Sequence, residues 1–107
     1  MIDVTDVRRE IVQLAREDDY GLYEIIWRLN GVYPSAPQTE KWGVARQAMS
    51  ELLAEGAVQL LLLKPVSCSR SLVQPFYWSM FLDDPQAWAV SEESYVGFGI
   101  VEAVKDA

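Results

Sequence analysis

Chemically reactive side chains are scarce in this sequence. Histidine is absent, and Cys68 is the single cysteine. Histidine is the residue that most often serves as a general base, so neither the Cys68 thiol nor the hydroxyls of the serine-rich stretch 66–71 have their usual activating partner. One cysteine also excludes an intramolecular disulfide. The sequence therefore predicts a protein that is not an enzyme, and an enzyme built on carboxylates alone is the remaining catalytic alternative.

Neighbouring acidic residues are the remaining candidates for metal binding. Three such pairs occur, namely Asp18–Asp19, Asp83–Asp84 and Glu92–Glu93. None of them lies in the alternating acidic pattern of a calcium loop, and zinc or copper would ordinarily recruit histidine or several cysteines. No glycine-rich phosphate-binding pattern is present either. We therefore expect no cofactor and interpret the three pairs as solvated charges.

The net charge of −7 is spread unevenly along the chain. Residues 1–70 hold ten acidic and eight basic residues, whereas residues 71–107 hold six acidic residues and one basic residue. Proteins that bind nucleic acids usually gather lysine and arginine on one surface, because neutralising phosphates supplies most of the non-specific affinity. The charge distribution instead favours a basic partner.

Three segments carry apolar residues at helical spacing. The first runs from Val4 to about Arg16 behind Asp3, which is a good N-cap residue. The second covers residues 22–29, where Asn30-Gly31 is expected to end the helix. The third begins near Gln38 or Thr39 after two prolines and ends at residue 55, before Gly56.

The second half of the sequence predicts two strands separated by a longer excursion. Residues 57–64 favour a strand that ends at Pro65, and residues 95–102 alternate as a second strand. Between them we expect a loop over 66–71, a short helix over 76–83 and a helical turn over 84–88. The two strands are expected to pair antiparallel and to pack on the helices, because an isolated hairpin is marginal in water.

This order of elements resembles that of winged-helix proteins. The resemblance lies in the second-helix core Leu22-Tyr23-Glu24-Ile25-Ile26, in the passage ELLAEGAVQL at residues 51–60, and in the closing strand. Together with residues 82–88, these segments are similar to small bacterial winged-helix proteins in which a short helix enlarges the wing. The resemblance implies an α+β fold of three helices followed by a two-stranded antiparallel wing with a helical insertion, in a single domain over residues 1–107.

The resemblance also implies a test for DNA binding, because the third helix of a winged helix enters the major groove. A winged helix-turn-helix transcriptional regulator is accordingly the alternative function. The basic and amide residues that would lie near DNA are Lys41, Arg46, Gln47, Lys64 and Arg70.

Surplus aromatic and leucine side chains favour a protein interface instead. Trp42 and Trp88 fit core positions, whereas Trp27, Tyr77 and Trp78 are predicted anchors for a partner. If Val58, Leu60 and Leu62 face the core from the first strand, Leu61 and Leu63 face outward. Their cover is either the excursion folding back, a second copy of the chain in a homodimer, or another protein.

We therefore predict a non-catalytic, acidic protein-binding module, such as an immunity- or antitoxin-type partner of a basic protein. Its charge would come from Asp83, Asp84, Glu92 and Glu93. The N-terminus lacks a basic start followed by an apolar run, and the apolar run 58–63 is too short to span a bilayer. A cytoplasmic location without membrane contact is expected.

Overall fold

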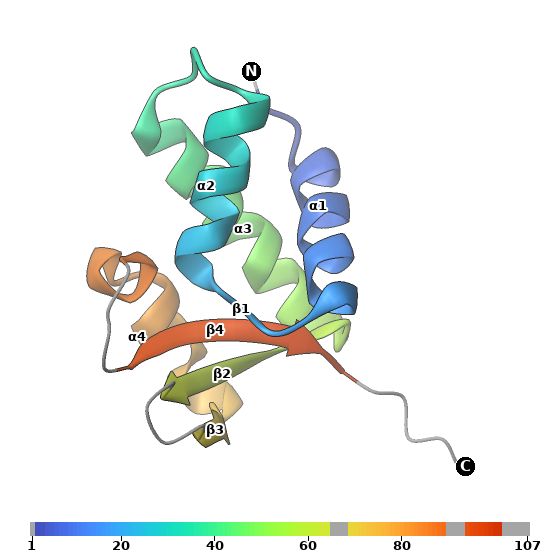
Figure 1. The fold of residues 1–107 in the computed structure, drawn as a ribbon, viewed down its shortest axis with the longest axis vertical. Helices are drawn as coiled ribbons and strands as arrows, with labels where there is room; N and C mark the ends of the chain where they lie inside the picture. The colour runs from blue at the N-terminus through green and yellow to red at the C-terminus, as the bar shows by residue number, and fades with distance from the viewer. Residues whose placement is uncertain (1, 65–68, 90–93, 102–107) are drawn as a thin grey trace.

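The computed structural model describes residues 2–64, 69–89 and 94–101, and it has an α+β fold. The helices are α1 (Val4–Glu17), α2 (Leu22–Val32), α3 (Gln38–Glu55) and the short α4 (Trp78–Leu82). The strands are β1 (Tyr20–Gly21), β2 (Val58–Lys64), β3 (Ser69–Leu72) and β4 (Tyr95–Ile100). Two 3₁₀ turns, η2 (Pro75–Tyr77) and η3 (Pro85–Trp88), flank α4. The three long helices stand over the sheet (Figure 1).

Local sequence signals explain where the long helices begin and end. Asp3 caps α1 by accepting a hydrogen bond from the Thr5 backbone N–H at 2.8 Å. Gly56 ends α3 in a left-handed conformation with φ of 77°, which a side chain would disfavour. The predicted end of α2 at Leu29 was wrong, because the helix continues through Asn30 and Gly31 to Val32.

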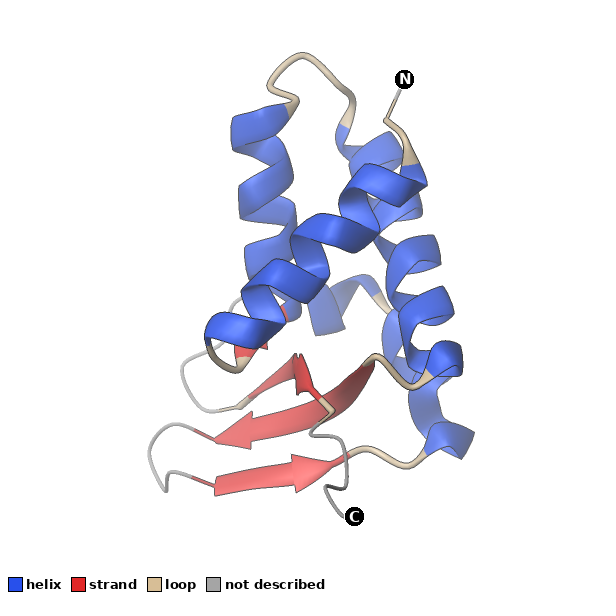
Figure 2. Cartoon of the chain, turned by 90° about the vertical axis from the view of Figure 1, so that its right-hand side faces the viewer, coloured by secondary structure: helices blue, strands red, loops and turns tan. Residues whose placement is uncertain are grey.

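The four strands form one antiparallel sheet in the order β1-β4-β2-β3. The predicted antiparallel pairing of the two long strands is confirmed, with Val58 opposite Ile100 and Leu63 opposite Tyr95. The long helices lie on one side of the sheet (Figure 2). The core forms between them, where α1, α2 and α3 pack on Leu60 and Phe98, both of which have no exposed surface.

Two strands lie where the sequence predicted none. Residues 69–71 belong to the expected loop 66–71, but together with Leu72 they form β3, which pairs with β2 from Leu61 to Lys64. Tyr20 and Gly21 form β1, which pairs with Phe98 and Gly97 of β4. Serine-rich and two-residue strands carry little periodicity of their own, so pairing with an existing strand decides their structure. The sheet therefore has four strands rather than the predicted two.

The excursion between β2 and β4 is helical in part. The predicted helix over 76–83 is divided into η2 and α4, and the helical turn over 84–88 is present as η3. The expected strand over 95–102 spans residues 95–100, and residue 102 lies outside the described residues.

Leu61 and Leu63 face away from the helices, as predicted, and both are covered. Leu61 is 1% exposed and Leu63 is 8% exposed, although both lie on the face opposite the helices. Leu63 is flanked by Arg70 on β3 and Tyr95 on β4, which are directly opposite it in the sheet. The side chains of this outer face cover one another, so the leucines do not need a second copy of the chain for cover.

In the part of the chain that the structure describes, no helix is both long and apolar enough to cross a membrane.

Candidate functional site

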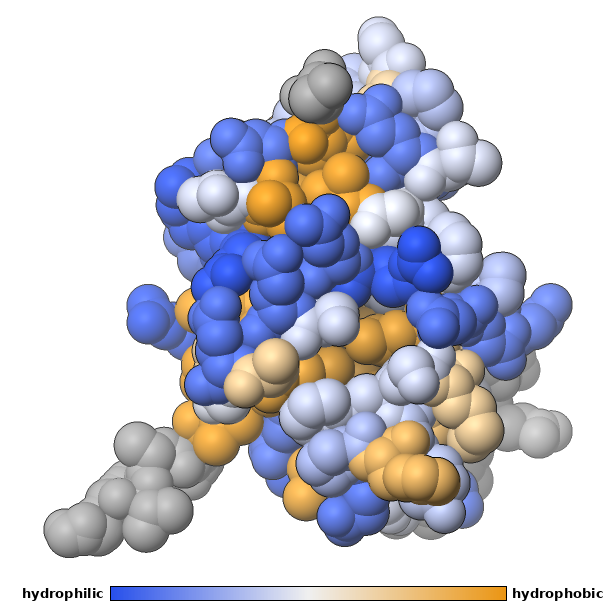
Figure 3. Space-filling view, turned by 180° about the vertical axis from the view of Figure 1, so that it is seen from behind, coloured by the Kyte–Doolittle hydropathy of each residue, from blue (hydrophilic) through white to orange (hydrophobic). Residues whose placement is uncertain are grey.

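Four of the seven large apolar side chains that are exposed in the described residues lie in and beside the η2–α4 segment. Phe76 is 85% exposed, Met80 59%, Leu72 55% and Tyr77 44%. The Phe76 and Tyr77 rings meet edge to face, with centroids 5.1 Å apart. We call these four residues the η2–α4 patch. In the view from behind, hydrophobic side chains reach the surface in separate areas, one near the top and others across the middle and the lower part of the molecule (Figure 3). Exposed apolar clusters of this kind ordinarily mark interaction surfaces.

The patch is exposed because other residues of the same segment, Trp78 and Leu82, contact the rest of the domain. Leu82 is 3% exposed and belongs to the core, and the half-buried Trp78 packs against it. The Trp78 indole N–H donates to the Val73 carbonyl at 3.3 Å, and the Trp88 indole N–H donates to the Leu82 carbonyl at 3.0 Å. These contacts tie α4 to the domain. Phe76 and Met80 are four residues apart and face solvent.

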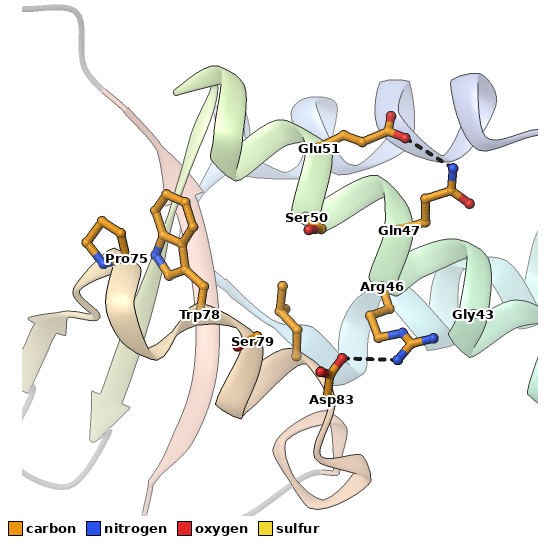
Figure 4. A pocket seen from close by; sticks show the side chains of 10 residues that line it. Gly43, Arg46, Gln47, Ser50, Glu51, Pro75, Trp78, Ser79 and Asp83 are labelled. Atoms are coloured by element: carbon orange, nitrogen blue, oxygen red, sulfur yellow. Dashed lines mark hydrogen bonds and ion pairs between the residues drawn. The ribbon is translucent and has the colours of Figure 1, made fainter.

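A groove with a volume of about 580 Å³ separates α3 from the η2–α4 segment. An ion pair crosses it, because Arg46 on α3 donates to the Asp83 carboxylate at 3.0 Å (Figure 4). The Arg46 guanidinium also lies over the Trp42 ring, 4.8 Å from its centroid. Gln47 donates to Glu51 at 3.1 Å along the same helix (Figure 4). The groove is thus lined by polar groups that bind one another.

The residues predicted to lie near DNA do not form a common basic surface. Lys41 was expected to face outward, but it is 2% exposed and its ammonium donates to Asn30 Oδ1 at 3.0 Å. A long aliphatic stem lets lysine occupy a mostly apolar site when its charged end has a partner. Arg70 pairs with Asp19, and Lys64 lies exposed at the end of β2. Arg46 and Gln47 are engaged within the groove.

A second aromatic surface lies where α2 meets the outer face of the sheet. Tyr23 contacts Trp27 with ring centroids 4.9 Å apart, and it contacts Tyr95 at 5.5 Å, both edge to face. Trp27 is 58% exposed, and the two tyrosines are half-buried. Tyr23 fits there because Gly21 lacks a side chain, and a Cβ at that position would collide with the Tyr23 ring. We call these three residues the aromatic ladder.

Of the predicted protein-binding residues, Tyr77 lies in the η2–α4 patch and Trp27 lies in the aromatic ladder. Trp78 is half-buried and holds α4, so it is not an exposed anchor. Asp83 pairs with Arg46, and exposed Asp84 caps η3 by accepting from the Gln86 backbone N–H at 3.0 Å. Glu92 and Glu93 lie outside the described residues, as does Cys68.

The structure adds binding candidates that the sequence analysis did not select. Phe76 and Met80 lie within the predicted helix over 76–83 but were given no binding role, and Leu72 lies outside every predicted element. The position of Leu82 could have indicated that Phe76 is exposed. Residues six positions apart lie on different sides of a helix, so when Leu82 faces the core, Phe76 does not. Trp88 and Trp42 were predicted to be core residues; Trp88 is 6% exposed, whereas Trp42 is half-buried beneath Arg46.

Within residues 2–64, 69–89 and 94–101, no group of three or more cysteine, aspartate or glutamate side chains is arranged to hold a metal ion.

Comparisons of the chain with protein-family models, with curated proteins and with solved structures gave no significant match.

Proposed function

We propose that this protein is a non-catalytic protein-binding module that docks through the η2–α4 patch. The observation that carries the proposal is the exposure of Phe76, at 85%, beside Met80, at 59%, on a segment fixed by Trp78 and Leu82. Large apolar side chains held rigidly in solvent lose little conformational entropy when a partner covers them. Aromatic residues and methionine are also enriched in the cores of protein interfaces.

The proposed partner is a basic protein. The net charge of −7 supports this choice, because a field of one sign favours association with a partner of the opposite sign. An immunity- or antitoxin-type role in the cytoplasm, in which an acidic protein covers a basic target, is the finer form of this proposal. Leu72, Phe76, Tyr77 and Met80 would supply the apolar contacts, and Asp83 and Asp84 lie immediately after α4.

The proposed scaffold is winged-helix-like. Three helices precede the antiparallel pair β2 and β4, and β3, η2, α4 and η3 are inserted between these two strands. Using such a scaffold for protein binding rather than for DNA is supported by the internal contacts of α3. Lys41 is buried, Arg46 binds Asp83, and Gln47 binds Glu51.

A pull-down with matched variants tests this function. The double variant Phe76→Ser/Met80→Ser removes two exposed apolar side chains, and Val32→Ser removes another that lies at the end of α2 and is 49% exposed. We expect a basic protein to be recovered from the native cell extract with the wild type and with Val32→Ser, but not with the double variant. Equal recovery with all three proteins would contradict the proposal.

A further inference from the structure

We propose that the aromatic ladder of Tyr23, Trp27 and Tyr95 is a docking surface for an arginine side chain of a basic protein. The ladder lies on elements other than those of the η2–α4 patch, so this inference stands independently of the proposed function. The ring contacts at 4.9 and 5.5 Å build a continuous aromatic surface from α2 to β4. Its end is open, because Trp27 is 58% exposed.

Carboxylates beside the ladder indicate a cationic occupant. Glu24 follows Tyr23 directly on α2, and Asp18 and Asp19 lie between α1 and β1. Burial and the nearby charges of Glu24, Asp18 and Asp19 raise the pKa of Tyr95. Burial and Glu24 likewise raise the pKa of Tyr23. Burial is the larger cause of both pKa shifts, and the carboxylates near the two tyrosines add to it.

Two of these carboxylates accept hydrogen bonds from backbone N–H groups. Glu24 Oε2 accepts from the Gly21 backbone N–H at 3.1 Å, and Asp18 Oδ1 accepts from the Asp19 backbone N–H at 2.8 Å. Both donors are neutral, so neither bond cancels a charge. The nearby arginines are already paired, Arg70 with Asp19 and Arg28 with Glu10 at 3.4 Å. Asp18 and Glu24 therefore place negative charge near the half-buried tyrosines of the ladder.

Arginine fits this chemistry better than a purely apolar or an anionic group. Its planar guanidinium stacks on an aromatic face while its N–H groups donate to carboxylates, and tryptophan is the strongest aromatic partner for a cation. The position of Asp18 also opposes the stability of the unbound fold in part. Asp18 lies at the C-terminus of α1, where negative charge is unfavourable to the helix dipole.

The test uses the full chain and two probes, the peptide acetyl-Gly-Arg-Gly-amide and its citrulline counterpart. Citrulline has nearly the same shape as arginine but carries no charge. Binding is followed by nuclear magnetic resonance, with the indole N–H of Trp27 as the reporter and those of Trp42, Trp78 and Trp88 as internal references. We expect the arginine peptide to shift the Trp27 signal selectively and the citrulline peptide to bind more weakly.

Matched variants locate the site. Trp27→Leu removes a ring that is largely exposed, so the fold should be kept, and we expect the arginine peptide to lose about two- to fivefold in affinity. Phe76→Leu removes an exposed ring from the η2–α4 patch and should leave the affinity unchanged. Asp18→Asn should weaken binding, whereas Asp84→Asn should have a smaller effect. Equal binding of both peptides, or an equal loss in Trp27→Leu and Phe76→Leu, would overturn the inference.

Discussion

The Arg70 guanidinium donates to the Asp19 carboxylate through Nε at 2.5 Å and through Nη2 at 3.3 Å. Arg70 lies on β3 and Asp19 directly precedes β1, so this ion pair joins the two edges of the sheet across β4 and β2. A Cβ at Gly99 would collide with Asp19 Oδ1, and a Cβ at Gly97 would collide with Leu63. The two glycines thus leave room for neighbouring side chains to lie flat over the outer face.

Gly99→Ala should destabilise the protein because the added methyl group displaces Asp19 from its position over β4. Overpacking of this kind typically costs about 1–3 kcal/mol. Urea unfolding measures the loss in the free energy of unfolding relative to the wild type. The control is Gly43→Ala on α3, where a Cβ meets nothing within 4 Å and should stabilise the helix by roughly 0.5–1 kcal/mol. A Gly99→Ala protein as stable as the wild type would show that Asp19 has room to move.

The hydrogen bond between buried Lys41 and exposed Asn30 gives a second prediction. Asn30→Ala removes the oxygen that the Lys41 ammonium binds at 3.0 Å and should cost about 1–3 kcal/mol, since a buried donor then lacks its partner. Lys41→Met keeps the aliphatic volume without the charge and should cost less. Urea unfolding measures the free energy of unfolding of both variants, and the two losses can then be compared. A larger loss in Lys41→Met would mean that the ammonium itself stabilises the fold.

The ion pair between Arg8 and Glu51, at 2.8 Å, predicts a pH dependence of stability. Hydrogen bonds from Arg8 and Gln47 lower the pKa of Glu51 below its ordinary value of 4.5. The folded state therefore holds this proton less tightly than the unfolded state, and the contribution is present above pH 4.5 and lost as the pH falls through the lowered pKa. The difference in Tm between the wild type and Glu51→Gln should shrink below that pH. A difference that does not change with pH would contradict this assignment.

We predict that the protein does not bind DNA non-specifically. Fluorescence anisotropy of a labelled random-sequence duplex should show no saturable binding at about 50 mM salt, because few arginines and lysines are available to neutralise phosphates. Lys41 is buried, Arg46 pairs with Asp83, and Arg70 pairs with Asp19. Micromolar affinity that falls steeply with added salt would instead support the regulator alternative, and Arg46→Ala would then be the first variant to measure.

The sequence predicted the long helices and the antiparallel pair of long strands because their apolar periodicities extend over many residues. It did not predict β1 or β3, which depend on pairing with β4 and β2 rather than on their own composition. The outward orientation of Leu61 was predicted, but its cover was left open, because alternation along one strand does not show what the neighbouring strands cover. For a related reason Lys41 was expected near DNA and Phe76 was not selected for binding, since the exposure of a side chain depends on the elements that pack around it.

Site-specific photo-crosslinking tests the central claim most directly. A photoreactive benzoylphenylalanine would replace Phe76 in the η2–α4 patch, and the same residue at Val32 would serve as the control at a comparable apolar surface position. The account predicts that irradiation in the native cell joins position 76, but not position 32, to a basic protein. Crosslinking of position 76 only to a second copy of this chain, or equal products from both positions, would contradict the claim that this patch binds a basic partner.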